Sequence, residues 1–336
     1  MEVVMEKQFI KDLKVGDKVK TLFGVVKKNF ANYSPSSAKA PGQFLKLVLA
    51  DATGNIEGRV WDGACDVAGL FDEGDIVMVE GYVSEYNGLQ INIVNIKKYE
   101  DNVDLTLFQQ STSKDRKEMV KRFNELIQSV EDTYLKKLLL SIFNDKNTYW
   151  AFINSPAAQR IHHAYIGGLL EHSLEVAQVC ELIASEYKDI INRDLLITGA
   201  LLHDIGKIKE YNFSSISFEM TDIGKLIGHL VIGKEMVDEK IREIPDFPKE
   251  LQLSISHMII SHHGEKQWGS PEVPKTIEAF ALFHSDLLSA RLNQFSGLLN
   301  KHTDSESPWT PWDKFLERSA YMSNYSDSNS KENMNK

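Results

Sequence analysis

The stretch Leu201-Leu202-His203-Asp204-Ile205-Gly206-Lys207 places a histidine beside an aspartate after an apolar run with helical character. A neighbouring imidazole and carboxylate can bind one metal ion, and the carboxylate can also reach a second ion. The dipeptide alone is weak support for a metal site, because a chain of 336 residues can contain it by chance. Its meaning therefore depends on the other histidines and aspartates of the chain.

Further metal-ligand candidates occur in the same half of the chain, each group on a separate predicted helix. They are His172, His229, His262, His263 and Asp286. One ligand group per helix is how a helical bundle builds a buried metal site. A single helical histidine is more often a core or surface residue, so the ordered set supports the site better than any member does. Imidazole and carboxylate ligands suit manganese, iron, cobalt, nickel or zinc, and the lack of cysteine in this ligand set disfavours structural zinc.

Composition limits the class of protein without deciding its function. The chain is 42% hydrophobic and 26% charged, which is ordinary for a globular protein of two or three domains. Its net charge of −10 argues against indiscriminate binding to polyanions, although a local groove or bound cations can still attract nucleic acid. No apolar run approaches the roughly 18 residues that span a bilayer, and the first residues do not form a signal peptide. With two distant cysteines, Cys65 and Cys180, these features predict a cytoplasmic protein without a membrane partner.

The first hundred residues have the alternating pattern of half-buried strands. Apolar residues alternate through Phe44-Leu45-Lys46-Leu47-Val48-Leu49, and turn sequences such as Asp51-Ala52-Thr53-Gly54 separate the runs. This pattern predicts a helix near 64–70 and five strands, near 17–30, 42–51, 54–62, 75–86 and 88–98. Five short strands with a helix before the fourth predict an OB-fold β-barrel.

This region resembles OB-fold domains of the nucleic-acid-binding type at Val60-Trp61 and at Glu73-Gly74-Asp75-Ile76-Val77. On the predicted strands, four side chains point away from the leucine face: Phe44, Lys46, Arg59 and Trp61. Aromatic rings can stack on bases, and cations between them can bind backbone phosphates. The alternative is that the two aromatic residues pack against the helical domain.

From about residue 104 the apolar spacing becomes helical and continues to about residue 322. In this region the order His, His-Asp, Asp at His172, His203-Asp204 and Asp286 resembles the HD superfamily of metal-dependent phosphohydrolases. The residues between them resemble the branch of that superfamily with two metals. By this resemblance, the first metal takes His172, His203, Asp204 and Asp286. The second takes Asp204 as a bridge, His229 and the His262-His263 pair, of which one or both members bind.

The resemblance implies an N-terminal OB-fold barrel followed by an all-α HD-type domain. The expected limits are 10–100 for the barrel, 101–150 for a linker and leading helices, 151–322 for the phosphohydrolase domain and 323–336 for a disordered tail.

Two neighbouring metals would lower the pKa of a shared water and generate hydroxide at neutral pH. They would also neutralise negative charge that develops on the phosphate, with Asp204 as the bridging catalytic residue. Lys207 could supply another cation to the phosphate, or could simply be a solvated lysine at a helix end. His162 and His163 precede the first ligand helix, and His163 could protonate the leaving oxygen, although ordinary polar packing explains it equally well.

The whole arrangement is similar to the YhaM family of bacterial 3′→5′ exoribonucleases. The most specific segments of this resemblance are 162–172, His-His-Ala-Tyr-Ile-Gly-Gly-Leu-Leu-Glu-His, and 259–264, Ile-Ile-Ser-His-His-Gly. It implies removal of nucleotides from the 3′ end of single-stranded RNA, with single-stranded DNA as a further substrate. It favours Mn²⁺ or Co²⁺ and leaves Fe²⁺, Ni²⁺ and Zn²⁺ open.

Two other functions remain open at this stage. One is an HD-type phosphodiesterase or nucleotidase for small nucleotides, in which the barrel has a regulatory role. The other is a catalytically inactive nucleic-acid-binding protein whose metal site is structural. The sequence makes no prediction about oligomeric state.

Overall fold

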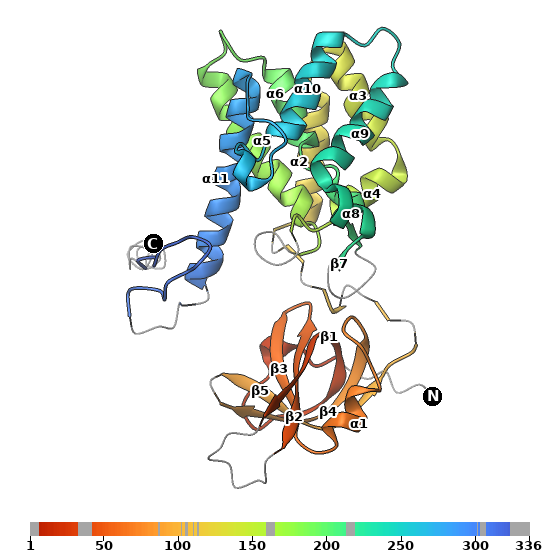
Figure 1. Cartoon of the computed structure of the whole chain (residues 1–336), viewed down its shortest axis with the longest axis vertical. Coiled ribbons are helices and arrows are strands. Elements are labelled where there is room, and N and C mark those ends of the chain that lie inside the picture. The colour runs from red at the N-terminus through yellow and green to blue at the C-terminus, as the bar shows by residue number, and fades with distance from the viewer. Residues whose placement is uncertain are drawn as a thin grey trace, which may run out of the picture. The chain divides into compact units, whose positions relative to one another are not determined.

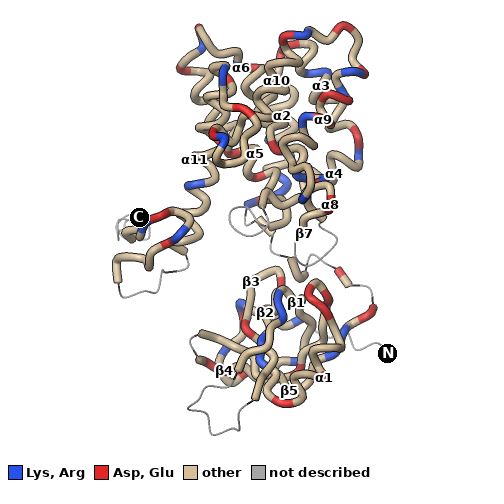
Figure 2. The backbone as a smooth tube through the Cα atoms, in the orientation of Figure 1, with Lys and Arg blue, Asp and Glu red and all other residues tan. Residues whose placement is uncertain are grey.

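The structure is a computed structural model, and it divides the chain into two compact units, a barrel unit and a helical unit (Figure 1). It describes residues 7–32, 42–86, 88–101, 103–104, 107–109, 111–112, 114–158, 165–212, 219–300, 302 and 307–322. Basic and acidic residues occur along both units, as expected for a chain whose net charge comes from scattered groups (Figure 2). The predicted tail at 323–336 lies outside the described residues, and the expected domain limits stay a prediction.

The barrel unit contains the predicted OB-fold. Its elements are η1 (Ile10–Asp12), β1 (Lys18–Asn32), β2 (Gln43–Asp51), β3 (Gly54–Val60), α1 (Ala64–Ala68), β4 (Ile76–Glu85) and β5 (Leu89–Lys98). The strands form a closed barrel in the order β1-β2-β3-β5-β4, in which only the β3–β5 pair is parallel. The five strands and the helix before the fourth confirm the predicted fold class.

Alternation along β2 decides which side chains fill the barrel. Leu45, Leu47 and Leu49 are fully buried, and they pack in one core with the inward residues of the other strands. Opposite them, Lys46 of β2 is paired with Arg59 of β3 on the outer face. Because successive side chains in a strand point to opposite faces, the leucine positions alone determine this outward orientation.

The helical unit is built from a series of short helices and one long one. They are α2 (Arg116–Ser129), α3 (Thr133–Phe143), α4 (Lys146–Asn154), α5 (Gly168–Glu186), α6 (Arg193–Leu202), α7 (Lys207–Glu210), α8 (Asp222–Ile227), α9 (His229–Arg242), α10 (Lys249–Ser261), η3 (Lys266–Trp268) and α11 (Ile277–Asn300). Between α7 and α8 the chain forms a two-stranded ribbon, β6 (Tyr211–Asn212) and β7 (Glu219–Met220), which is assigned to the barrel unit. Among the described residues, no helix combines the length and the apolar character needed to cross a membrane.

Aspartate side chains cap the first three helices of the helical unit. Asp115, Asp132 and Asp145 precede α2, α3 and α4, and each carboxylate accepts hydrogen bonds from backbone N–H groups of the first turn. Helices α5 and α6 lie in the interior of the helical unit. Most residues of α5 are buried, and so is every residue of α6 from Leu195 to Leu202. Helix α5 therefore holds His172 inside the core, and the end of α6 leads directly into the buried His203 and Asp204.

The segment 307–322 corrects one prediction, because it is not helical. Its chain turns back on itself through isolated antiparallel bridges between Trp309 and Tyr321 and between Asp313 and Arg318. Pro308 and Pro311 explain the difference, since proline lacks an N–H and disfavours helical conformation in the residue before it. Apolar spacing alone was therefore misleading after α11.

Candidate metal centre

The seven predicted ligands converge because they lie at helix ends or on the buried faces of helices. His172 is on α5 and Asp286 on α11, whereas His203 and Asp204 directly follow α6. His229 is the first residue of α9, and the His262-His263 pair directly follows α10. Backbone turns set these positions: Gly228 and Gly264 have φ of 77° and 78°, conformations that glycine adopts without strain. The structure thus brings all seven residues into one region.

The first half of the centre consists of His172, His203, Asp286 and one oxygen of Asp204. The Nε2 atom of His172 lies 2.9 Å from Asp286 Oδ1 and 3.3 Å from His203 Nε2. Asp204 Oδ2 lies 3.5 Å from His172 Nε2 and 3.4 Å from His203 Nε2. Ligand atoms about 2.0–2.2 Å from a common ion lie roughly 3.0–3.6 Å apart, so this half fits a metal ion.

The second half uses the other oxygen of Asp204. Asp204 Oδ1 lies 3.5 Å from Nε2 of His229 and 3.5 Å from Nε2 of His262. His263 completes the group, with its Nε2 3.3 Å from that of His229. Asp204 Oδ1 is buried and has no hydrogen-bond partner among the described residues. A buried carboxylate oxygen without a donor is costly unless a cation satisfies it, so this half also fits a metal ion.

Two histidines are oriented by backbone carbonyls of their own helices. His203 Nδ1 lies 2.9 Å from the carbonyl oxygen of Ala200, and His262 Nδ1 lies 2.8 Å from that of Ile259. A protonated Nδ1 that donates to a carbonyl leaves Nε2 with its lone pair directed at the centre. Local helix geometry therefore selects the tautomer that can bind metal.

Side chains orient two more histidines. His172 Nδ1 lies 3.1 Å from Ser289 Oγ, and the Ser289 hydroxyl donates to Glu175 at 2.8 Å. His229 Nδ1 lies 3.0 Å from a carboxylate oxygen of the buried Glu210. Such outer hydrogen bonds fix ring orientation and raise ligand basicity in metal sites.

The electrostatics of the centre favour bound cations. Burial lowers the pKa of His172 and His262, and burial together with the neighbouring His262 and His229 lowers the pKa of His263 to about 3. These rings are therefore neutral near pH 7, the state that binds metal. Burial would raise the pKa of Asp204, but Lys207 and His203 outweigh it and hold that pKa well below its usual range.

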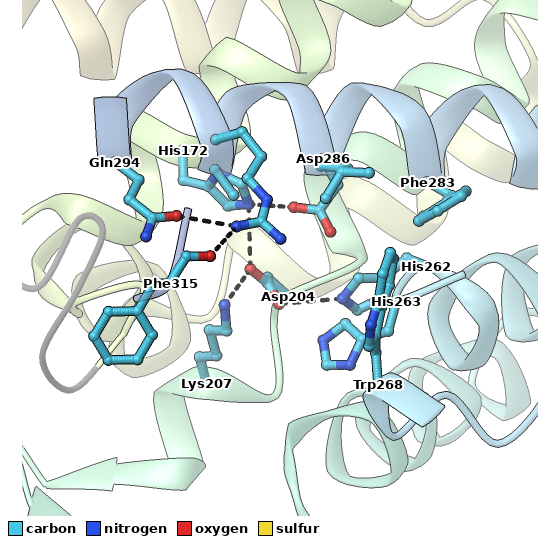
Figure 3. Close-up of a pocket in the computed structure, with 13 residues that line it drawn as sticks. His172, Asp204, Lys207, His262, His263, Trp268, Phe283, Asp286, Gln294 and Phe315 are labelled. Atoms are coloured by element: carbon cyan, nitrogen blue, oxygen red, sulfur yellow. Dashed lines mark hydrogen bonds and ion pairs between the residues drawn. The ribbon is translucent and has the colours of Figure 1, made fainter. Parts of the chain in front are cut away.

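Five of the seven metal-ligand candidates line a pocket of about 370 Å³ (Figure 3): His172, Asp204, His262, His263 and Asp286. Within the helical unit, α11 contributes Phe283, Asp286, Arg291 and Gln294 to its wall. Trp268 of η3 and Phe315 of the C-terminal segment add two aromatic rings. The pocket is thus polar at the metal centre and aromatic beyond it.

Comparison with known proteins agrees with this geometry. Family models described as "HD domain" and "OB-fold nucleic acid binding domain" match residues 169–291 and 21–99. A curated protein named "3′-5′ exoribonuclease YhaM" from Oceanobacillus iheyensis is 32% identical over 261 residues, which are 77% of this chain and 81% of that protein. The chain belongs to the YhaM exoribonuclease family. A relative of the same name from Listeria monocytogenes serotype 4b is 32% identical over 305 residues, 89% of this chain and 93% of that protein.

Membership of the YhaM family confirms the predicted resemblance and makes the chain an enzyme with a metal-dependent HD domain. Among solved structures, a domain of replication protein A from Methanococcus maripaludis is 30% identical. It covers 28% of this chain and 96% of that one, with a TM-score of 0.24.

In this YhaM-family chain, the predicted nucleic-acid-binding residues of the barrel form one cluster. The rings of Phe44 and Trp61 are 4.6 Å apart, and the Arg59 guanidinium lies 5.5 Å from each. Lys46 and Arg59 both pair with Glu57, at 2.5 and 2.6 Å, so their charges are partly compensated. The structure therefore places the four residues together, and their contact with nucleic acid stays a prediction.

The two remaining catalytic candidates have different outcomes. Lys207 is buried, and its Nζ lies 2.6 Å from Asp204 Oδ2 at the edge of the pocket. Its position is that of an ion-pair partner of Asp204, and its contact with phosphate stays a prediction. His163, with His162, lies outside the described residues.

Sequence reasoning missed several groups that line the pocket. Phe283, Leu287, Ala290 and Gln294 follow helical spacing around Asp286, so a helical face drawn through Asp286 would have found them. No comparable signal exists for Phe315, which reaches the pocket from the non-helical C-terminal segment.

Proposed function

We propose that this chain is a metal-dependent 3′→5′ exoribonuclease that hydrolyses the phosphodiester bonds of single-stranded RNA, with single-stranded DNA as a further substrate. The observation that supports it best is the division of the two Asp204 oxygens between two sets of imidazole ligands. The names of the relatives supply the polarity and the substrate class of the proposal.

In this proposal His172, His203, Asp204 and Asp286 would hold one divalent ion. Asp204, His229, His262 and His263 would hold the other. All the donor atoms are imidazole nitrogens or carboxylate oxygens, and this set suits Mn²⁺ or Co²⁺. Fe²⁺, Ni²⁺ and Zn²⁺ would compete for the same site. When bound, such a pair lowers the pKa of a water and neutralises charge on a phosphate.

The protein's own groups would keep the centre ready for that chemistry. Lys207 holds Asp204 ionised and oriented through its 2.6 Å contact with Oδ2. An ammonium group has three donors, so Lys207 can contact a substrate phosphate in the pocket while it keeps this bond. We propose His163 as the proton donor to the leaving oxygen, because it lies five residues before α5, the helix that carries His172.

The barrel would bind the RNA strand through its aromatic cluster. Trp61 is partly exposed and would stack on a base, whereas Phe44 is only 7% exposed and supports the Trp61 ring from behind. The Arg59 guanidinium lies 5.3 Å from the ring of Tyr86. Alanine substitution of a base-stacking ring lowers single-strand affinity by about 1–3 kcal/mol. We therefore expect Trp61→Ala to weaken RNA binding about tenfold in a filter-binding assay, and equal affinity would remove Trp61 from the interface.

The function is tested by incubating 5′-labelled single-stranded RNA with the protein and Mn²⁺. The products are separated by length at successive times. A ladder of shortening products is expected, and an RNA with a blocked 3′ end should resist degradation. Degradation of the blocked RNA would mean that the polarity is wrong. Cleavage restricted to small nucleotides would favour the phosphodiesterase or nucleotidase, and binding without turnover in every metal would favour a structural site.

The role of the bridging carboxylate is tested by Asp204→Asn, which preserves shape and removes charge. We expect loss of turnover with RNA binding largely intact. Asp222→Asn is the matched control, because the Asp222 side chain is 96% exposed and is not among the metal-ligand candidates. This variant should keep wild-type turnover. Turnover retained by Asp204→Asn would exclude the bridging role.

A further inference from the structure

The pocket continues beyond the metal-ligand candidates on two sides. Gln294 and Phe315 lie on one side of Asp204, and Trp268 and Phe283 on the other (Figure 3). None of these four side chains carries a carboxylate, an imidazole or a thiolate, so they lie outside the set of metal-ligand candidates. The pocket therefore has room and chemistry for a ligand larger than a phosphate group.

Arg291 is a positive charge held in this pocket by neutral groups. Its Nη1 donates to the carbonyl oxygen of Phe315 at 2.9 Å and to Gln294 Oε1 at 3.3 Å. Among the described residues, no carboxylate lies within ion-pair distance of it, in contrast to Lys207, which pairs with Asp204. A guanidinium oriented by neutral acceptors keeps its full charge for a phosphate.

Phe315 is a half-exposed ring on a fixed backbone. Asp313 Oδ1 accepts hydrogen bonds from the N–H groups of Phe315 and Leu316, at 2.9 and 2.8 Å. Leu316 is only 4% exposed and anchors the turn, whereas 48% of Phe315 is exposed. A large exposed ring loses little conformational freedom when its turn is already ordered, so it suits stacking on a base.

Arg291 lies on the same helix, α11, as the metal-ligand candidate Asp286. Arg291 follows Asp286 by five residues, which corresponds to about 7.5 Å of helix rise. An arginine side chain is long enough to direct its guanidinium back into the shared pocket, where it meets the Phe315 carbonyl. Phe315 itself lies outside residues 169–291, the part that matches the HD family model, so this side of the pocket is an addition to that domain.

We propose that Arg291 and Phe315 bind the nucleotide of single-stranded RNA that lies next to the bond being cut. Arg291 contacts its backbone phosphate, and Phe315 stacks on its base. The inference rests on the proposed exoribonuclease function. It makes the C-terminal segment 307–322 part of the substrate site, because that segment supplies both the ring and the carbonyl that orients the guanidinium.

The test compares full-length variants on a trinucleotide RNA with Mn²⁺. This substrate is shorter than the roughly four nucleotides that an OB fold covers, so the pocket dominates its binding. Loss of one stacked base at 1–3 kcal/mol corresponds to about a 5- to 140-fold rise in KM. We expect Phe315→Ala and Arg291→Ala each to raise KM about tenfold while kcat changes little, since they remove binding common to ground and transition states.

Two controls match these variants. Phe280 of α11 is 56% exposed and is not part of the pocket wall, so Phe280→Ala should keep the wild-type KM. Arg242 is an exposed residue at the end of α9, so Arg242→Ala is the control for Arg291→Ala and should also keep the wild-type KM. Phe315→Leu keeps apolar volume and lacks a ring face, so it should show the same rise in KM without the risk of an open cavity.

The outcomes separate this inference from the proposed function. If wild-type protein forms no ladder from longer RNA, the proposed function fails. If the ladder forms and the Arg291 and Phe315 variants keep the wild-type KM, the inference alone is overturned. It is also overturned if the variants lose bound Mn²⁺ and kcat together at unchanged KM, because these residues would then support the metal centre rather than the nucleotide.

Discussion

Gly206 follows Asp204 by two residues and faces the start of α9. A methyl group at Gly206 would lie 2.1 Å from the carbonyl oxygen of His229 and 2.7 Å from the backbone nitrogen of Gly233. Both atoms belong to the backbone, so no side-chain rotation can relieve the contact. The substitution Gly206→Ala must therefore separate the turn that holds Asp204 from α9.

The required displacement can be worked out from these distances. Ordinary contact begins at 3.4 Å, and its difference from 2.1 Å is about 1.3 Å of retreat. His229 is the first residue of α9 and moves with it, whereas ligand distances in metal sites hold to about 0.2 Å. Overpacking of this kind costs about 1–3 kcal/mol of stability. We expect the protein to remain folded and to lose the half of the centre that contains His229.

The assay is equilibrium dialysis with Mn²⁺, together with RNA turnover and thermal unfolding. If the wild type binds two ions per chain, as proposed, Gly206→Ala should bind one, and turnover should fall about 100-fold, as misplacement by about 1 Å can do. The control is Gly297→Ala on α11, because a methyl group there meets nothing within 4 Å. Two bound ions and wild-type turnover in Gly206→Ala would refute the reasoning.

Three more predictions follow from named contacts. Ser289→Ala removes the hydroxyl 3.1 Å from His172 Nδ1 and should lower metal affinity about 10- to 100-fold by titration calorimetry; unchanged affinity would show that Ser289 does not orient the ring. Cys65 is exposed, whereas Cys180 is buried, and burial raises the pKa of the Cys180 thiol to about 12. A thiol reagent should therefore modify one cysteine in the native protein and two after unfolding. In metal-free protein, burial and neighbouring imidazoles lower the pKa of His263 to about 3, so between about pH 6.5 and 3 the unfolded state binds a proton that the folded state does not. Stability should fall as pH falls through this range, by up to about 1.4 kcal/mol per pH unit for this group, and His263→Gln should flatten the slope measured by denaturant unfolding.

Local patterns made much of the fold predictable. Alternation in Phe44–Leu49 predicted which side of β2 faces the barrel core, because side chains of a strand alternate by geometry. Gly264, just after His262-His263, has the positive φ that often follows the end of a helix, so the end of α10 agrees with a local signal. Local spacing failed at 307–322, where apolar residues belong to turns and bridges rather than to a helix.

The sequence by itself determined the order of the ligand candidates and the residue types available to a metal, because these are properties of the chain alone. Only the tertiary structure decided that the two oxygens of Asp204 face different sets of imidazoles. It also decided that Ser289, 117 residues away, orients His172, and that Phe315 lines the pocket. These relations arise from packing between distant helices and turns, and no spacing within one helix or strand encodes them.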